Sequence, residues 1–205
     1  MSLTLYYAPL TTPMIVYWAL AELGLHYDAI RVDLDAEEQK QPGFLQLNPN
    51  GQVPVLIHDG VALFESVAIL IHLGETFGVE KGLYPGPGLR RAVTIRWLVW
   101  CSVALGGANS RFHHNTSERF PAAQRSAPAA ERAMADVHTL LRILDQALFG
   151  KRYLVEEQFS LADVHVSSWV SYLRRNGTPL HAYAALSAWR ERCVGRPAAP
   201  PLVKG

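Results

Sequence analysis

One stretch of the chain has the residue types to hold a short peptide. Pro54 directly precedes the apolar run at 55–57, and because proline cannot donate to a sheet ladder it is typical of a strand start or edge. A cis bond between Val53 and Pro54 would turn the backbone of Val53 outward, with its N–H and C=O free to pair with an extended peptide. Further along, Glu65 and Ser66 stand at a predicted helix start, where unpaired backbone N–H groups favour a bound carboxylate. Together these features predict a site for a small peptide that carries its own carboxylate and amine.

The elements that must position this site follow from the first 80 or so residues, which alternate between strand and helix signals. Apolar, β-rich runs predict strands at about 3–7, 27–32, 55–57 and 61–64, and helical signals cover about 13–23, 37–47 and 66–77. Asp59-Gly60 between the last two strands favours a type I′ hairpin, because both central residues of that turn need positive φ. The order βαβαββα fits a mixed four-stranded sheet with helices on its faces.

A linker and a second, helical half follow. The stretch 82–88 holds three glycines and two prolines in seven residues, which is typical of a linker. After it the strand signals vanish, and helices are predicted at about 89–105, 128–149, 160–176 and 186–194, the first interrupted by Gly106-Gly107. Ser160 and Asp163 have the spacing of a capping box. We therefore predict an α/β domain at 1–80, a linker at 81–88 and an all-helical domain at 89–205, with the tail at 196–201 an irregular wrap or a loose end.

The composition narrows the function classes. With 205 residues, 49% of them hydrophobic and 18% charged, the chain can build one or two ordinary cores. A net charge of +1 gives no electrostatic reason to expect nucleic acid or a membrane surface as partner. No apolar run approaches the roughly 18 residues of a membrane span, and the N-terminus has no signal-peptide pattern. Cys101 and Cys193 lie far apart, so we expect no disulfide framework and a cytoplasmic protein.

Three motifs resemble those of the cytosolic glutathione transferases. They are Asn-Pro-Asn-Gly-Gln-Val-Pro at 48–54, Glu-Ser-Val-Ala-Ile at 65–69 and Phe-Ser-Leu-Ala-Asp at 159–163. The resemblance covers nearly the whole chain. It implies a thioredoxin-like βαβαββα domain followed by a helical bundle, glutathione as co-substrate, no metal, and a C₂ homodimer. The chain is most similar to the serine-type, bacterial-like branch, with Thr12 at the place usually held by serine or cysteine.

Glutathione must lose its thiol proton to become a nucleophile, and a free thiol has a pKa near 8.5. Lowering that pKa by about 2 units requires roughly 2.7 kcal/mol, which is within the roughly 1.5–3 kcal/mol of one hydrogen bond to an ionised group. The resemblance assigns this hydroxyl to Thr12, just before Pro13, with Thr11 as the near neighbour. Tyr7 is the rival, at the place that holds the tyrosine of tyrosine-type members. A helix N-cap alone would also explain Thr12.

The resemblance also assigns the parts of glutathione to the peptide-binding stretch. The γ-glutamyl end goes to Glu65 and Ser66, for which a helix cap is the alternative reading. The cysteinyl part pairs with the backbone of Val53 beside the proline. The glycyl carboxylate is assigned to two polar side chains, Gln52 and Asn50.

The second substrate is expected in the groove between the two halves. Candidate contacts are Leu10, Arg111 and His113, although a solvated loop would also explain the last two. The paired histidines at 113–114 lack any Cys/His/Asp spacing that would support a metal. Some bacterial relatives place a histidine near the thiol where this chain has Gly106; Asn109 is its candidate substitute.

The leading hypothesis is therefore a detoxifying glutathione transferase that joins the glutathione thiolate to a small hydrophobic electrophile. The same thiolate would serve a glutathione-dependent isomerase, peroxidase or dehalogenase, because a fold does not settle the reaction. A disulfide-exchanging role is weaker on this sequence, since no cysteine lies in the first 100 residues. The threonine at position 12 and the missing histidine also fit a non-catalytic scaffold or ligand carrier.

Overall fold

The N-terminal half is built on a mixed four-stranded sheet. The computed structural model describes residues 1–9, 13–155 and 157–204. Its strands are β1 (Leu3–Tyr7), β2 (Asp28–Arg31), β3 (Val55–His58) and β4 (Val61–Phe64), in the order β2-β1-β3-β4. The β1–β2 pair is parallel, and the other two pairs are antiparallel. The predicted βαβαββα order and mixed sheet are confirmed.

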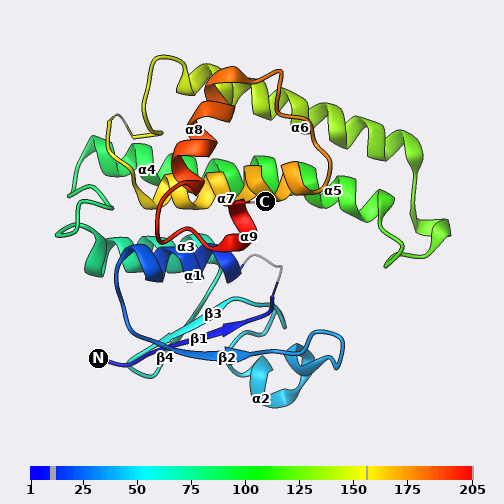
Figure 1. The fold of residues 1–205 in the computed structure, drawn as a ribbon. Coiled ribbons are helices and arrows are strands. Elements are labelled where there is room, and N and C mark those ends of the chain that lie inside the picture. Colours follow the sequence, from blue (N-terminus) through cyan, green and yellow to red (C-terminus); the bar gives the residue numbers. More distant parts are fainter. Residues whose placement is uncertain (10–12, 156, 205) are drawn as a thin grey trace.

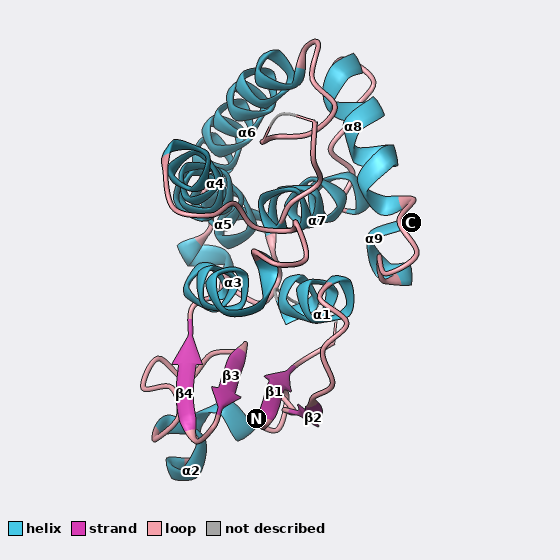
Figure 2. Ribbon diagram, turned by 90° about the vertical axis from the view of Figure 1, so that its left-hand side faces the viewer, coloured by secondary structure: helices cyan, strands magenta, loops and turns pink. Residues whose placement is uncertain are grey.

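Helices separate this sheet from the helical half. Figure 2 shows α1 (Pro13–Glu22) and α3 (Ser66–Leu73) side by side between the sheet and the second half, with α2 (Pro42–Leu45) on the far side of the sheet. A π-helical turn at Gly74–Gly78 continues α3. Five apolar side chains of α1 are buried: Ile15, Val16, Trp18, Ala19 and Leu20. The two helices therefore share one core with the sheet below and the bundle above.

Two turns in this half show where sequence rules succeed and fail. Asp59 and Gly60 have φ values of 46° and 85°, so the predicted hairpin with two left-handed residues is confirmed. The single helix predicted over 37–47 is wrong. It is split into a 3₁₀ turn at Glu38–Lys40 and α2, and Gln41 between them is extended. Pro42 causes the break, because a proline forces the residue before it out of the helical region.

The second half is all helical, as predicted. Its helices are α4 (Leu89–Trp100), α5 (Gly107–Thr116), α6 (Ala127–Leu148), α7 (Leu161–Arg175), α8 (Ala184–Val194) and the short α9 (Pro201–Lys204). Figure 1 shows this bundle above the sheet, with the C-terminus returning to lie near α1 and α7. In the described part of the chain, no helix is both long and apolar enough to cross a membrane.

The interruption predicted at Gly106-Gly107 is wrong. The backbone continues from α4 into α5 through a π-helical turn at Cys101–Gly106, and both glycines have helical dihedral angles. A Cβ atom on Gly106 would lie 3.3 Å from Cζ2 of Trp169 on α7. The glycine therefore serves a close approach of two helices, a role that sequence alone does not distinguish from a helix break.

The capping box that opens α7 is confirmed. The Asp163 carboxylate accepts hydrogen bonds of 2.9 Å from the backbone N–H of Ser160 and of Leu154, and from the indole N–H of Trp189. The Ser160 hydroxyl lies 2.9 Å from the same carboxylate. Because Asp163 is fully buried, one carboxylate ties the start of α7 to α8 and to the preceding loop.

The C-terminal tail wraps back onto the N-terminal half. Arg196 donates two hydrogen bonds of 2.7 Å to the carboxylate of Glu22 at the end of α1, and its guanidinium lies 3.9 Å from the ring centre of Phe159. The tail then forms α9, whose Val203 carbonyl accepts from Arg190 at 2.7 Å. The predicted irregular wrap thus ends in a short helix that reaches the site described next.

Candidate functional site

A cavity of about 330 Å³ lies where the two halves meet. The N-terminal half contributes one wall from the loop before β3 and from the start of α3, namely Asn48, Gln52, Val53, Pro54, Glu65 and Ser66. The facing wall comes from the α4–α5 junction and α7, and its polar side chains are Ser102, Ser110, His165 and Trp169. The structure therefore brings five of the six predicted glutathione-binding residues together around one space.

The loop before β3 is held in shape by Asn48. This side chain is 3% exposed; its Nδ2 donates to the Gln52 carbonyl at 2.7 Å, and its Oδ1 accepts from the Asn50 N–H at 3.0 Å. The Val53–Pro54 peptide bond is cis. Within the described part of the chain, neither the N–H nor the C=O of Val53 has a hydrogen-bond partner. The main chain of Val53 is thus free to pair with a ligand.

Asn50, the sixth predicted binding residue, does not line the cavity. It is exposed, and its carbonyl accepts from the Lys40 ammonium at 3.4 Å. Asn48, which the sequence analysis passed over, lines the wall in its place. The reason is an Asx turn, in which a short side chain accepts a hydrogen bond from the backbone two residues further along and therefore points into the turn. Asn48 makes this bond and faces inward, whereas Asn50 faces outward.

The start of α3 combines backbone strain with free donors. Glu65 adopts φ 67° and ψ 115°, a conformation that side-chain-bearing residues rarely occupy. Such strain costs about 1–3 kcal/mol and is concentrated at functional sites. Ser66 opens the helix directly after it, so the unpaired N–H groups of the first turn and the Ser66 hydroxyl border the cavity. This end of the cavity is suited to a carboxylate.

The facing wall carries polar nitrogen atoms without partners. The Ser102 hydroxyl lies 3.3 Å from Nε2 of His165, which is 0% exposed. Burial lowers the pKa of His165 to about 3, so its ring is neutral at physiological pH. Nδ1 of His165 and Nε1 of Trp169 are both buried, and neither has a hydrogen-bond partner among the described residues.

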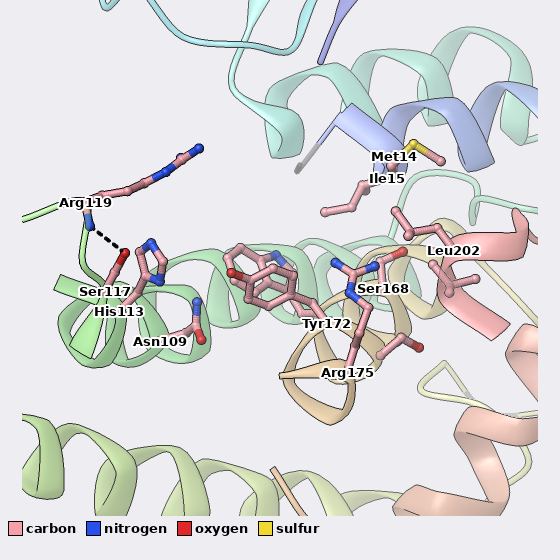
Figure 3. Close-up of a pocket in the computed structure, with 13 residues that line it drawn as sticks. Met14, Ile15, Asn109, His113, Ser117, Arg119, Ser168, Tyr172, Arg175 and Leu202 are labelled. Carbon is pink, nitrogen blue, oxygen red and sulfur yellow. Dashed lines mark hydrogen bonds between the residues drawn. The ribbon is translucent and has the colours of Figure 1, made fainter. Parts of the chain in front are cut away.

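A second cavity of about 340 Å³ adjoins the first, and Trp169 lines both. Figure 3 shows Met14 and Ile15 of α1 on one side, Tyr172 and Arg175 of α7 opposite them, and Leu202 of α9 at one end. The other end is polar. It contains Asn109 and His113 of α5, followed by Ser117 and Arg119.

The second cavity is cationic. Among the described residues that line it there are two arginines, Arg119 and Arg175, and no aspartate or glutamate. Neither arginine forms an ion pair with a carboxylate in the described part of the chain. The Arg175 guanidinium lies 5.5 Å from the ring centre of Tyr172. This cavity is therefore suited to a ligand that is both anionic and partly apolar.

The remaining predicted site residues are placed as follows. Thr11, Thr12 and Leu10 lie outside the described residues. Tyr7, at the end of β1, is half-buried against the core and lines neither cavity. His113 lines the second cavity, as noted. Arg111 lines neither cavity, because its guanidinium forms an ion pair with Asp136 of α6 at 2.9 Å.

Among the described residues, no group of three or more His, Cys, Asp or Glu side chains could hold a metal ion. Several polar residues that line the cavities escaped the sequence analysis: Asn48, Ser102, His165, Trp169, Arg119 and Arg175. Asn48 opens the first motif, and His165 and Trp169 follow the third on α7, whereas Ser102, Arg119 and Arg175 lie far from all three and reach the cavities only through the packing of the helical half. The i, i+4 spacing of His165 and Trp169 on α7 was the available signal, since it places both on one helix face.

Comparison with known proteins agrees with this geometry. Residues 1–75 match the glutathione S-transferase N-terminal domain, and residues 108–197 match the C-terminal domain. The disulfide-bond oxidoreductase YfcG of Escherichia coli (strain K12) is 34% identical over 205 residues, covering 95% of this chain and 91% of YfcG. The chain belongs to the glutathione S-transferase family.

Solved structures of this family share the fold. A glutathione transferase family member from Pseudomonas fluorescens Pf-5, with two glutathione molecules bound, is 26% identical with a TM-score of 0.87, over 98% of this chain and 92% of that one. Ure2p, a yeast prion protein, in complex with glutathione, is 25% identical with a TM-score of 0.88, over 100% of this chain and 93% of that one. The thioredoxin-like domain and helical bundle expected from the resemblance are thereby confirmed.

Proposed function

We propose that this protein is a glutathione-dependent thiol–disulfide oxidoreductase. One observation carries the proposal: two cavities of similar size share Trp169, and the second is lined by two arginines and no described acid. A purely hydrophobic electrophile gives no reason for that charge. A second glutathionyl group, which has two carboxylates and a short peptide chain, does give a reason for the two arginines.

The first cavity would hold one glutathione. The free N–H and C=O of Val53 pair with its cysteinyl main chain, and the α3 start with Ser66 takes the γ-glutamyl carboxylate. Glu65 and Gln52 also line this cavity, and we assign the Glu65 carboxylate to the γ-glutamyl amine and Gln52 to the glycyl end. Each assignment matches a charge or donor of the protein with its complement in the ligand.

Activation of the thiol is assigned to the Thr12 hydroxyl, with Thr11 as the alternative. Tyr7 is the weaker choice, because it lines neither cavity. The thiolate of the bound glutathione attacks one sulfur of a substrate disulfide, the S–S bond breaks, and the other sulfur leaves as a thiolate. A second glutathione thiolate then attacks the mixed disulfide at the glutathione sulfur. The sum is two glutathiones and one disulfide giving oxidised glutathione and two thiols.

No protein cysteine takes part in this scheme, so the lack of cysteine in the first 100 residues does not oppose it. Cys101 and Cys193 are fully buried, and burial raises the pKa of both thiols. They are therefore unsuited to be nucleophiles. The 34% identity to an Escherichia coli disulfide-bond oxidoreductase supports the same reaction class.

The test is the rate of glutathione-dependent reduction of 2-hydroxyethyl disulfide, coupled to glutathione reductase. Arg119→Gln and Arg175→Gln should each raise the KM for the second glutathione about fivefold, since one exposed charge pair is worth up to about 1 kcal/mol. Arg111→Gln is the matched control, because its guanidinium is exposed on α5 and lines neither cavity. A wild-type protein without this activity refutes the proposal.

Conjugation of glutathione to a small hydrophobic electrophile is the second candidate. The apolar side chains Met14, Ile15 and Leu202 in the second cavity favour it. Turnover of 1-chloro-2,4-dinitrobenzene faster than that of any disulfide would select this reaction. The expected cytoplasmic location and C₂ homodimer belong to the same proposal, and light scattering of the purified protein tests the dimer.

A further inference from the structure

One polar side chain of the second cavity has no partner in the described part of the protein. Asn109, on α5, is 8% exposed, and its amide forms no hydrogen bond with a described residue. Neither amide atom is among the unpartnered polar atoms that lack accessible surface, so both are open to the cavity that Asn109 lines. Most buried polar side chains have a hydrogen-bond partner. A ligand in the second cavity would supply that partner.

The place of Asn109 on α5 decides which part of a ligand it meets. Ser110 lines the first cavity, whereas Asn109 and His113 line the second. Asn109 and His113 share one face of the helix, because residues four positions apart are neighbours on its surface. Arg119 lies beyond the C-terminal end of α5, and Figure 3 shows Asn109 on the side of His113 that faces Tyr172. A ligand that extends outward from the junction of the two cavities therefore passes Asn109 before it reaches Arg119.

The bound disulfide, on which this inference rests through the proposed function, carries its groups in a matching order. Two glutathionyl halves joined by an S–S bond place their sulfur atoms where the cavities meet, at Trp169. The main chain of the cysteinyl residue comes next to each sulfur, and the carboxylates lie at the outer ends. The cysteinyl main chain is therefore the part of the ligand at Asn109, and the carboxylates are the part at Arg119 and Arg175.

The amide of Asn109 matches the main chain of an extended residue. Its Nδ2 donates and its Oδ1 accepts, while the N–H and C=O of one extended residue point to the same side. One asparagine amide can therefore form two hydrogen bonds with the cysteinyl main chain, as proposed for the backbone of Val53 in the first cavity. A guanidinium only donates, so the two arginines recognise the charge of a ligand and not its peptide.

We infer that Asn109 is a specificity-determining residue that pairs with the cysteinyl main chain of the second ligand. The second cavity thereby selects peptide disulfides over anionic disulfides that have no peptide group.

The experiment compares two disulfides as substrates for reduction by glutathione, with the released thiols separated by chromatography and the uncatalysed exchange subtracted. The disulfide of γ-glutamylcysteinyl-β-alanine has both carboxylates and peptide groups. The disulfide of mercaptosuccinate has two carboxylates on each half and no peptide group. Asn109→Leu keeps the branched shape of the side chain and removes its donor and its acceptor. It should raise the KM for the peptide disulfide about tenfold, which corresponds to about 1.4 kcal/mol, and leave the KM for mercaptosuccinate disulfide unchanged.

Two control variants separate recognition of the peptide from recognition of charge. Arg175→Gln should raise the KM for both disulfides, because each of them brings a carboxylate to that guanidinium. Gln146→Leu removes an amide that is exposed on α6 and lines neither cavity, so it should change neither KM.

An equal change of both KM values in Asn109→Leu, or no change in either, overturns the inference and leaves the proposed function intact. The same holds if the wild type has no lower KM for the peptide disulfide than for mercaptosuccinate disulfide. A wild-type protein that reduces no disulfide overturns both. Should Asn109→Leu fail to fold, Asn109→Ala, which has the residue of highest helix propensity, is compared on the same two disulfides and decides by the same criterion.

Discussion

The buried histidine of α7 should make folding stability depend on pH in a way that one substitution removes. His165 is 0% exposed, and burial lowers its pKa to about 3, against about 6.5 in an unfolded chain. The unfolded chain therefore binds the proton more tightly throughout that interval. The stability that His165 contributes is complete above pH 6.5 and is lost progressively as the pH falls toward 3.

The magnitude follows from the two pKa values. For a single site with these values, lowering the pH from 7 to 5 should cost about 2 kcal/mol of unfolding free energy, approaching 1.4 kcal/mol for each further pH unit. His165→Phe replaces the imidazole with a ring that does not titrate. The variant should lose about 2 kcal/mol less than the wild type over the same interval, whatever its stability at pH 7.

The assay is urea unfolding followed by circular dichroism at pH 7 and pH 5. Some pH dependence should persist in the variant, because burial and the neighbouring His58 also lower the pKa of His72. His181→Phe, which replaces an exposed histidine in the loop before α8, is the control and should match the wild type. Equal losses in the wild type and His165→Phe would show that the buried ring is protonated as readily in the folded chain as in the unfolded one, and would refute the reasoning.

Three further substitutions test how the site is held. Asp163→Ala leaves three buried N–H donors without the carboxylate that now accepts their hydrogen bonds. It should lower the free energy of unfolding in urea by about 3 kcal/mol or more. Glu22→Gln weakens the ion pair to the C-terminal tail. The variant should have a free energy of unfolding about 1–3 kcal/mol lower, and proteolysis of the tail should be faster. Gly74→Ala would place a Cβ atom 2.6 Å from Cγ of Tyr84, so it should lower Tm by an amount equivalent to about 1–3 kcal/mol. Gly43→Ala, where a Cβ would meet no atom within 4 Å, should be nearly neutral.

Rules that depend only on residues adjacent in sequence predict much of the fold correctly. The Asp59-Gly60 hairpin and the capping box of α7 are set by residues adjacent in sequence, and both were predicted correctly. The helix predicted over 37–47 is broken before Pro42, although the rule that a proline forces the preceding residue out of the helical region is itself a local one. Gly106-Gly107 failed for a different reason, since the contact with Trp169 that explains Gly106 joins two helices far apart in the chain.

The candidate site also has one part that the sequence motifs predict and one part that they do not. Gln52, Val53, Pro54, Glu65 and Ser66 belong to two short motifs, and they line one cavity. The facing wall, from the α4–α5 junction and α7, contains no residue of the three motifs, so only the packing of the helices shows which of its side chains line the cavity. Arg111 shows the difficulty: it lies on α5 and pairs with Asp136 outside the cavity, whereas Arg119, in the turn after α5, lines it.

Calorimetric titration with oxidised glutathione tests the central claim most directly, because that ligand has one glutathionyl half for each cavity. We predict one molecule bound per chain, with Ser66→Ala in the first cavity and Arg175→Gln in the second each weakening the same binding event. If Ser66→Ala weakens binding and Arg175→Gln does not, the second cavity does not take a glutathionyl group, and the account of a disulfide oxidoreductase is contradicted.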